Sequence, residues 1–244
     1  MRRAHGPAVC AAAFAAVLLA GTAAAQKRPA DSASGAAPRA ASAATGAKPT
    51  GAASYGQRFA GLCAACHGAN GRSDLPGTPV LAGQHSFYAI TQLFLFREGR
   101  RSNEAMTAVA KTLTNDDLRG FSEFIGTLPP VPPPPAATPP DPAKMSKGRA
   151  LARQHKCVFC HGDDFAGGAQ VPRIAGQRED YLRDSLRGFK SGQRPGYTQA
   201  MIEAVSQVPV DDLDTMAYYA ARFPLAGTAT PSASAPRAGA SAPR

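Results

Sequence analysis

Apolar residues gather in segments of helical length along this chain, and loops rich in glycine and proline separate them. Each half has three such segments. The third of each half begins with an acid pair and is followed by a proline, Pro129 or Pro224, which are start and stop signals for helices. Strand signals are weak throughout. We therefore predict an all-α fold, with one helix leading into residue 63, helices at 85–96 and 115–127, one leading into residue 157, and helices at 180–189 and 210–222.

The two halves of the chain are copies of each other. The sequence Pro-Val-Leu-Ala-Gly-Gln at residues 79–84 returns as Pro-Arg-Ile-Ala-Gly-Gln at residues 172–177, an offset of 93 (172 − 79). A cysteine motif that begins at Cys63 returns at Cys157, an offset of 94 (157 − 63). An offset this steady over several landmarks indicates a duplicated domain.

Segments of low complexity flank and separate the two domains, which we place at residues 54–128 and 143–225. Residues 129–142 hold a run of prolines, which favours an extended polyproline II strut and forms the predicted linker. Residues 26–53 and 226–244 are mostly Ala, Ser, Gly, Pro and Thr. Such a composition cannot bury enough apolar surface to offset the entropy of ordering, so we predict a disordered leader and a disordered tail.

Residues 1–25 have the features of a secretory signal peptide. Arg2 and Arg3 precede an apolar run from Ala8 to Ala20, and small residues follow up to Ala25. The run is shorter than the ~20 apolar residues that a bilayer crossing needs, so we expect cleavage near Ala25 rather than an anchor. No later run reaches ~18 apolar residues, so we expect a soluble, exported protein, periplasmic in a bacterium.

Each domain contains one Cys-x-x-Cys-His motif. On a helical turn, positions i, i+3 and i+4 share a face, so two thiols and an imidazole can reach one flat macrocycle. This is the attachment signature of c-type haem, in which both sulfurs bond to the porphyrin and the histidine ligates iron. Cys-x-x-Cys also serves zinc and thiol redox chemistry, but two copies, each followed by histidine, favour two covalently attached haem c groups. The motif residues are Cys63, Cys66 and His67, and Cys157, Cys160 and His161.

The second axial ligand of each iron separates an electron carrier from a catalyst, because catalysis at iron needs an open position. Met106 is the only methionine of the first domain, and it follows His67 by 39 residues (106 − 67). Met201 lies at the same place in the second copy, 40 residues after the motif histidine (201 − 161). Core filling is the commoner role of a methionine, but matched placement in a loop before the last helix favours Met106 and Met201 as iron ligands. The competing methionines of the second domain are Met145 and Met216.

Two prolines are expected to support the haem histidines. Pro79 and Pro172 follow the motif histidines by 12 and 11 residues (79 − 67 and 172 − 161). Ligating histidines regularly donate their second ring N–H to a nearby acceptor, so we expect a backbone carbonyl near each proline in that role, against the alternative of a plain loop proline. His85 and His155 have no counterparts in the other copy, which favours ordinary surface or loop histidines. His85 is the alternative iron ligand in the first domain.

Charge bears on the partners of this protein. The formal charge is +10, much of it in the predicted signal peptide and leader, so we do not expect a nucleic-acid partner. We expect transient docking to an acidic protein, in which charge chiefly sets the association rate. The fifth cysteine, Cys10, lies in the signal peptide. The basic residues just before the candidate methionines either pair with haem propionates or form a solvated face; they are Arg97, Arg100, Arg101, Lys190 and Arg194.

Two tandem class I cytochrome c domains, each with Cys-x-x-Cys-His-Gly, Pro-x-x-Ala-Gly-Gln and a methionine before an Asp-Asp-Leu helix, resemble the dihaem cytochrome c4 family over residues 54–224. The resemblance implies His67 with Met106 and His161 with Met201 as axial pairs. It also implies domains packed about a pseudo-twofold axis, and a periplasmic shuttle of the respiratory chain between a quinol-oxidising cytochrome bc complex and a terminal oxidase.

We therefore expect an electron carrier that has no catalytic residue of its own and meets membranes only through its partners. Similar tandem domains occur as haem subunits of periplasmic dehydrogenases, which is the main alternative. A dihaem peroxidase or a thiosulfate-oxidising enzyme needs an open or labile iron site. We disfavour both, since the four domain cysteines serve attachment and each haem has its own methionine.

Overall fold

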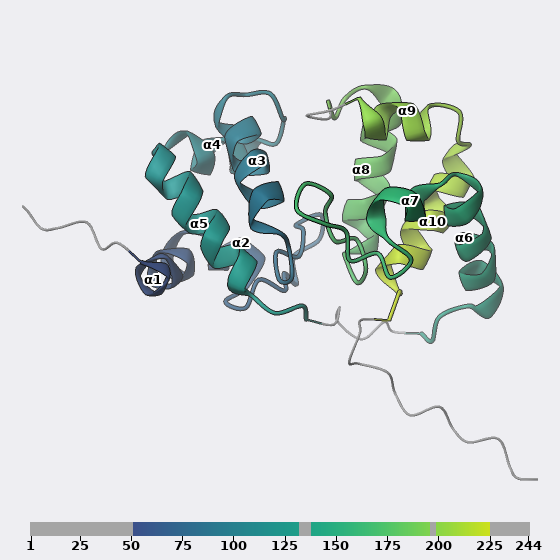
Figure 1. The fold of residues 1–244 in the computed structure, drawn as a ribbon, viewed down its shortest axis with the longest axis horizontal. Coiled ribbons are helices and arrows are strands. Elements are labelled where there is room, and N and C mark those ends of the chain that lie inside the picture. Colours follow the sequence, from purple (N-terminus) through teal and green to yellow (C-terminus); the bar gives the residue numbers. More distant parts are fainter. Residues whose placement is uncertain (1–50, 132–137, 196–198, 225–244) are drawn as a thin grey trace, which may run out of the picture. The chain divides into compact units, whose positions relative to one another are not determined.

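The structure is a computed structural model that describes residues 51–131, 138–195 and 199–224. Within those ranges it contains helices and no strand, in agreement with the all-α prediction (Figure 1). The predicted signal peptide and tail, and most of the predicted leader, lie outside the described residues. No helix in the described ranges combines the length and apolar character that a bilayer crossing requires.

Five helices form the first domain. The three longest are α1 (Ala52–Leu62), α3 (Ser86–Arg97) and α5 (Asn115–Thr127), and they lie where the sequence predicts helices. The first two residues of α1, 52 and 53, fall within the predicted leader. Short helices α2 (Ala64–His67) and α4 (Glu104–Lys111) complete the domain. Helix α5 packs against α1 and α3, and α4 packs against α3, so the core lies among α1, α3 and α5.

The second domain repeats this order of helices. Its long helices are α6 (Pro142–Gln154), α8 (Glu179–Ser191) and α10 (Val210–Ala221), again at the predicted positions. Its short helices are α7 (Cys157–His161) and α9 (Ala200–Ser206). Helix α10 packs against α6 and α8, as α5 does against α1 and α3. The duplication inferred from the sequence is therefore a duplication of helix packing.

Local side chains fix where the long helices begin. The Thr114 hydroxyl accepts a hydrogen bond from the Asp117 N–H at 3.2 Å, and the Asp117 carboxylate accepts from the Thr114 N–H at 2.9 Å. This capping box satisfies two N–H groups that would otherwise lack partners at the start of α5. Asp141 caps α6 in the same sense, accepting from the N–H groups of Ala143 and Lys144. The helix start that the acid pair predicts near residue 115 is confirmed.

The prediction that both candidate methionines lie in loops is wrong. Met106 is the third residue of α4 and Met201 the second residue of α9. At eight and seven residues, these helices are shorter than the length at which a single amphipathic pattern is reliable. Asn103 supplies the start of α4, because its side chain accepts a hydrogen bond from the Met106 N–H at 2.9 Å.

Glycines allow the closest helix crossings in each domain. In the first domain a Cβ added to Gly120 of α5 would lie 2.0 Å from the ring of Tyr55 in α1. In the second, a Cβ on Gly148 of α6 would lie 2.3 Å from Tyr219 in α10. Since neither position has room for a methyl group, the first and last helices of each domain can approach only because glycine stands there.

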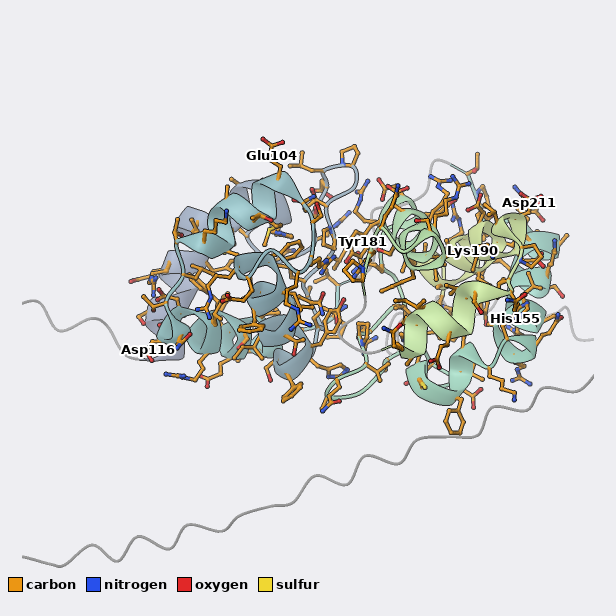
Figure 2. The ribbon with its side chains drawn as sticks, turned by 90° about the horizontal axis from the view of Figure 1, so that it is seen from above. Glu104, Asp116, His155, Tyr181, Lys190 and Asp211 are labelled. Atoms are coloured by element: carbon orange, nitrogen blue, oxygen red, sulfur yellow. The ribbon has the colours of Figure 1, made fainter. Side chains whose placement is uncertain are left out.

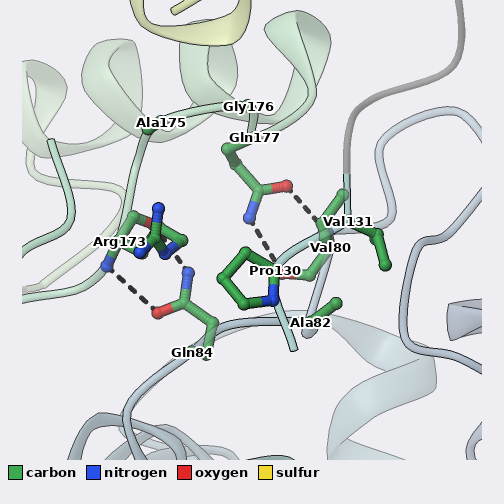
Figure 3. A pocket seen from close by; sticks show the side chains of 9 residues that line it. All are labelled: Val80, Ala82, Gln84, Pro130, Val131, Arg173, Ala175, Gly176 and Gln177. Atoms are coloured by element: carbon green, nitrogen blue, oxygen red, sulfur yellow. Dashed lines mark hydrogen bonds between the residues drawn. The ribbon is translucent and has the colours of Figure 1, made fainter. Parts of the chain in front are cut away.

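The described residues of the two domains belong to one compact unit, in which hydrogen bonds join the domains. The Gly77 N–H donates to the Asp180 carboxylate at 2.9 Å. Two glutamine side chains also cross between the domains, Gln84 to the backbone of Arg173 and Gln177 to the backbone of Val80 (Figure 3). The two domains are thus in direct contact, as the resemblance implies, although a proline-rich linker connects them.

Candidate haem sites

The cysteine motifs form the short helices α2 and α7, each directly after the first long helix of its domain. The thiols of Cys63, Cys66, Cys157 and Cys160 are unpaired, so all four are available for thioether bonds. The first cysteine of each motif is half-buried and the second is exposed. Burial raises the pKa of Cys63 to about 11 and raises that of Cys157. The exposed cysteines mark the solvent-facing side of each motif.

The motif histidines lie inward and are held by the carbonyls that the sequence predicts. His67 and His161 are 4% and 7% exposed. The Nδ1 of His67 lies 2.9 Å from the carbonyl oxygen of Pro79, and that of His161 lies 3.0 Å from the oxygen of Pro172. A carbonyl can only accept, so Nδ1 carries the proton and Nε2 keeps its lone pair. Burial lowers the pKa of both imidazoles, more than the carbonyl bonds raise it, and this favours the neutral ring that binds metal.

The loop after each motif brings the proline back to the histidine. Gly68 and Gly162 end the motif helices at φ angles of 77° and 80°, in a region that glycine enters without steric cost. In the first domain the carbonyl of Gly71 then accepts hydrogen bonds from the N–H groups of Leu81 and Ala82 at 2.7 and 3.1 Å. The second domain has the same bonds, from residues 174 and 175 to the carbonyl of residue 165. The spacing of 11 or 12 residues between each motif histidine and its proline therefore corresponds to a loop that these backbone hydrogen bonds close.

The candidate methionines are half-buried in α4 and α9. Met201 packs in the same apolar cluster as Cys157. The two competing methionines of the second domain have other places: Met216 is a buried core residue of α10, 7% exposed, and Met145 packs against the core from α6. The sulfur of Met216 lies 3.8 Å from that of Cys157, so this methionine lines the apolar surroundings of the motif.

Neither of the other two histidines that the structure describes has a counterpart in the other domain. His85 precedes α3, and its Nε2 lies 2.9 Å from the carbonyl oxygen of Ala166 in the second domain. That contact engages the ring nitrogen that an iron ligand would need, so the structure gives His85 an interdomain role instead. His155 ends α6, with a buried Nε2 that has no hydrogen-bond partner among the described residues.

A cluster of two arginines and two tyrosines joins the domains, and only its arginines were predicted from the sequence as functional residues. Arg101 is 9% exposed and donates to the hydroxyl of Tyr181 at 2.8 Å. Figure 2 shows Tyr181 between the helices of the two domains. Arg194 donates to the hydroxyls of Tyr181 and Tyr88 at 3.3 and 3.4 Å. Burial alone would raise the pKa of Tyr181, but the two guanidinium charges bring it down to about 7. Arg101 therefore does not belong to a solvated face.

The other three basic residues have different surroundings. Arg97 forms an ion pair with Glu98 at 2.9 Å and donates a hydrogen bond to the side chain of Asn115 at 2.9 Å. Lys190 donates to the carbonyl of Ser206 at 2.7 Å. Arg100 is exposed. Neither Arg101 nor Arg194 forms an ion pair with a carboxylate of the described residues. These two cations thus stand out as sites for an anion.

The residues present suit a covalent haem in each domain. Two free thiols and a buried neutral imidazole with an available Nε2 follow one another on a helical turn, next to an apolar core. A half-buried thioether lies on a second helix of the same domain. Nitrogen and thioether sulfur are an established axial pair for haem iron. The geometry of the donor groups therefore fits the group that the motif predicts.

Comparisons with known proteins agree with this geometry. The sequence model of the cytochrome c family matches residues 50–129 and 145–219. Cytochrome c4 of Thiocapsa roseopersicina is 35% identical over 156 residues, which cover 60% of this chain and 78% of that protein. The crystal structure of reduced cytochrome c4 from Pseudomonas stutzeri superposes with a TM-score of 0.64 at 25% identity, covering 72% of this chain and all of that one.

A third relative is named for its electron donor and not as a cytochrome c4. The thiosulfate dehydrogenase electron acceptor of Thiomonas intermedia is 31% identical over 184 residues, which cover 71% of this chain and 84% of that protein. Each of the three matches covers 60% or more of this chain, which is longer than either domain alone. With the helical fold and the two repeated motifs, these matches show that the chain belongs to the dihaem cytochrome c4 family, and that it is an electron-carrying cytochrome with two covalently attached haem c groups.

Proposed function

We propose that Cys63 and Cys66 attach the first haem, and that His67 and Met106 are its axial ligands. The support is the hydrogen bond from His67 Nδ1 to the Pro79 carbonyl, which leaves Nε2 as the only ring nitrogen able to bind iron. Cys157, Cys160, His161 and Met201 have the same roles in the second domain, on the strength of the matching bond to Pro172. When bound, haem iron takes up and releases single electrons.

We further propose that Arg101 and Arg194 receive the haem propionates. A buried cation needs a compensating anion, and among the described residues neither guanidinium has a carboxylate. The planar fork of arginine suits a carboxylate group. The Tyr88 and Tyr181 hydroxyls would then complete the hydrogen bonding of the same cluster.

The proposed physiological role is a periplasmic shuttle that takes electrons from a quinol-oxidising cytochrome bc complex and delivers them to a terminal oxidase. Residues 54–128 and 143–225 are the proposed haem domains, with export directed by a signal peptide cleaved near Ala25. No residue of the chain has a catalytic role in this proposal, because iron with both axial positions filled has none open for a substrate.

A second donor is supported by one observation. The relative from Thiomonas intermedia, 31% identical over 184 residues, is named as an electron acceptor of thiosulfate dehydrogenase. In that case the chain would receive electrons from a periplasmic dehydrogenase, and its haem chemistry would be the same. The two proposals differ only in the donor protein.

Methionine variants test the ligand assignment. Met106→Ala and Met201→Ala should each remove half of the methionine–iron charge-transfer band of the oxidised protein. Each should also lower the potential of one haem, since thioether sulfur favours reduced iron. Met145→Ala, which alters a methionine outside both pairs, is the matched control and should keep the full band. A band that survives in the double variant Met106→Ala, Met201→Ala would refute the assignment.

The donor is tested by stopped-flow reduction of the purified, oxidised protein. We expect fast reduction by a cytochrome bc complex supplied with quinol. The dehydrogenase alternative instead requires fast reduction by thiosulfate dehydrogenase supplied with thiosulfate. Rapid turnover of hydrogen peroxide by the wild-type protein would contradict both, because it would require an open iron position.

A further inference from the structure

One peptide group in the first domain makes hydrogen bonds at both of its ends. It joins Pro79 to Val80. Its oxygen lies 2.9 Å from Nδ1 of His67, and its N–H donates to Oε1 of Gln177 at 2.7 Å. Val80 and Gln177 are only 6% and 5% exposed. A short, buried chain of hydrogen bonds thus leads from the histidine of the first domain to a side chain of the second.

The second domain has the equivalent arrangement. In the peptide group between Pro172 and Arg173, the oxygen lies 3.0 Å from Nδ1 of His161, and the N–H donates to Oε1 of Gln84 at 3.2 Å. Gln84 is 7% exposed. Figure 3 shows the two amides crossing between the domains in opposite directions. Each domain therefore supplies an acceptor that completes the hydrogen-bond chain of the other.

Hydrogen bonds in series strengthen one another. When a peptide N–H donates to an oxygen, negative charge on its own carbonyl oxygen increases, and that oxygen becomes a better acceptor. A stronger bond from Nδ1 makes the ligating imidazole more basic. A more basic axial ligand stabilises oxidised iron and lowers the reduction potential, as hydrogen bonding around haem ligands does generally.

We infer that Gln84 and Gln177 are positioning residues, each of which sets the reduction potential of the haem in the opposite domain. The inference rests on the proposed assignment of His67 and His161 as iron ligands. The N–H···Oε1 bond of Gln177 is shorter than that of Gln84, 2.7 against 3.2 Å. Gln177 therefore has the larger effect, and its effect is on the first haem.

The amides also hold the interface, and the test has to separate the two roles. The Nε2 group of Gln177 donates to the Val80 carbonyl at 2.9 Å, and that of Gln84 donates to the Arg173 carbonyl at 2.6 Å. A variant that only weakened the interface would affect both haems, or the altered domain itself. An effect confined to the opposite haem is the signature of the hydrogen-bond chain.

The experiment compares Gln177→Met and Gln84→Met in the full-length holoprotein. Methionine has a similar length and cannot accept from the peptide N–H in the same way. Redox titration followed by NMR gives each haem its own potential, with resonances assigned through the Met106 and Met201 variants. In Gln177→Met we expect the ratio of reduced to oxidised first haem, at fixed ambient potential, to rise about threefold, which is ~28 mV for one electron. The second haem should not change.

In Gln84→Met we expect a smaller rise, confined to the second haem. The matched control is His85→Leu, which removes another interdomain hydrogen bond, at 2.9 Å to Ala166, without touching either peptide group. It should leave both potentials unchanged. Should Gln177→Met fail to fold, Gln177→Asn keeps the amide but makes it too short to reach Val80, and the first potential should again rise.

Equal shifts of both haems, a shift of the haem in the altered domain, or no shift would each overturn the inference. The Nδ1–H resonance of each motif histidine separates this failure from failure of the ligand assignment. In the oxidised wild-type protein a ligating histidine shows a strongly paramagnetically shifted Nδ1–H. If that shift is present and the potentials do not move, only the inference fails; if it is absent, the ligand assignment fails as well.

Discussion

At the scale of single residues, the chemistry of each site depends on one backbone carbonyl. The bonds from His67 and His161 to Pro79 and Pro172 fix which ring nitrogen is protonated and which way the ring faces. No charged group is needed for this, since a peptide oxygen is a sufficient acceptor. The buried rings stay neutral, and the site is protected from changes of pH near neutrality.

A charged residue of the first domain does respond to pH. Asp117 accepts hydrogen bonds from Arg58 at 2.6 Å and from the Thr114 N–H and hydroxyl. Burial alone would raise its pKa, but these bonds hold the pKa well below the usual value of about 3.9. Because the folded pKa is lower than the unfolded one, the stabilisation is complete above about pH 5 and is lost as the pH falls through the folded pKa.

We therefore predict that Asp117→Asn lowers the free energy of unfolding by about 1–3 kcal/mol at neutral pH. Urea unfolding from pH 7 down to pH 2 should show the difference from wild type shrinking as the pH falls. The control is Asp116→Asn, next in sequence, whose side chain is 71% exposed in its pair with Arg119. That change should cost less than about 1 kcal/mol, and an equal loss in both variants would contradict the role of Asp117.

The single-residue roles that depend on neighbours in sequence could be predicted, and those that depend on the other domain could not. The Cys-x-x-Cys-His motif and the carbonyls near Pro79 and Pro172 follow from short spacings. Gln84 and Gln177 stand in a visibly repeated motif, yet their partners lie 89 and 97 residues away along the chain. Nothing local distinguishes a glutamine that crosses an interface from one on the surface.

At the scale of helices, packing rather than propensity explains the use of glycine. Gly120 stands inside α5, where alanine would be a better helix former by about 1 kcal/mol. The ring of Tyr55 occupies the space that a Cβ would need. The apolar segment and the acid pair at its start predicted α5 correctly, but neither signal indicated this close crossing of α1 and α5.

We predict opposite effects for two glycine substitutions in the first domain. Gly120→Ala should destabilise it by about 1–3 kcal/mol, since α1 and α5 would have to move apart. Gly61→Ala, in α1 with nothing within 4 Å of the added Cβ, should stabilise it by up to about 1 kcal/mol through helix propensity. Thermal unfolding of the two holoproteins checks this, and a Gly120→Ala protein as stable as wild type would show that the crossing tolerates a methyl group.

The short helices α4 and α9 are where prediction from sequence failed. Their positions between glycine-rich loops and a following long helix favoured a loop, and each is too short to show a period. Asn103, whose side chain accepts from the Met106 N–H, is a residue type that favours helix starts and could have indicated α4. In α9 no side chain caps the start, so the packing of Val205 in the core, and of Met201 against it, has to stabilise that helix.

At the scale of the whole molecule, the net positive charge is expected to raise the rate at which the protein associates with an acidic redox partner. Without the two arginines of the predicted signal peptide the formal charge of the chain is +8 (10 − 2), and attraction between unlike charges speeds association more than it strengthens the complex. We predict that the bimolecular rate of electron transfer with an acidic redox protein falls steadily as salt is raised from 10 mM to 1 M, over which the screening length shortens from about 30 to 3 Å. Stopped-flow absorbance of the haems measures this rate. An uncharged small reductant serves as the control, and a salt-independent protein reaction would contradict the prediction.

The crossed glutamines bear on how such a chain arises. Residues at the same place in each repeat exchange the same bonds in both directions, which is the defining property of an isologous contact. A contact of this kind works equally between two separate copies of one small protein. Fusing the copies into a single polypeptide then requires no new surface, and it frees their association from any dependence on protein concentration.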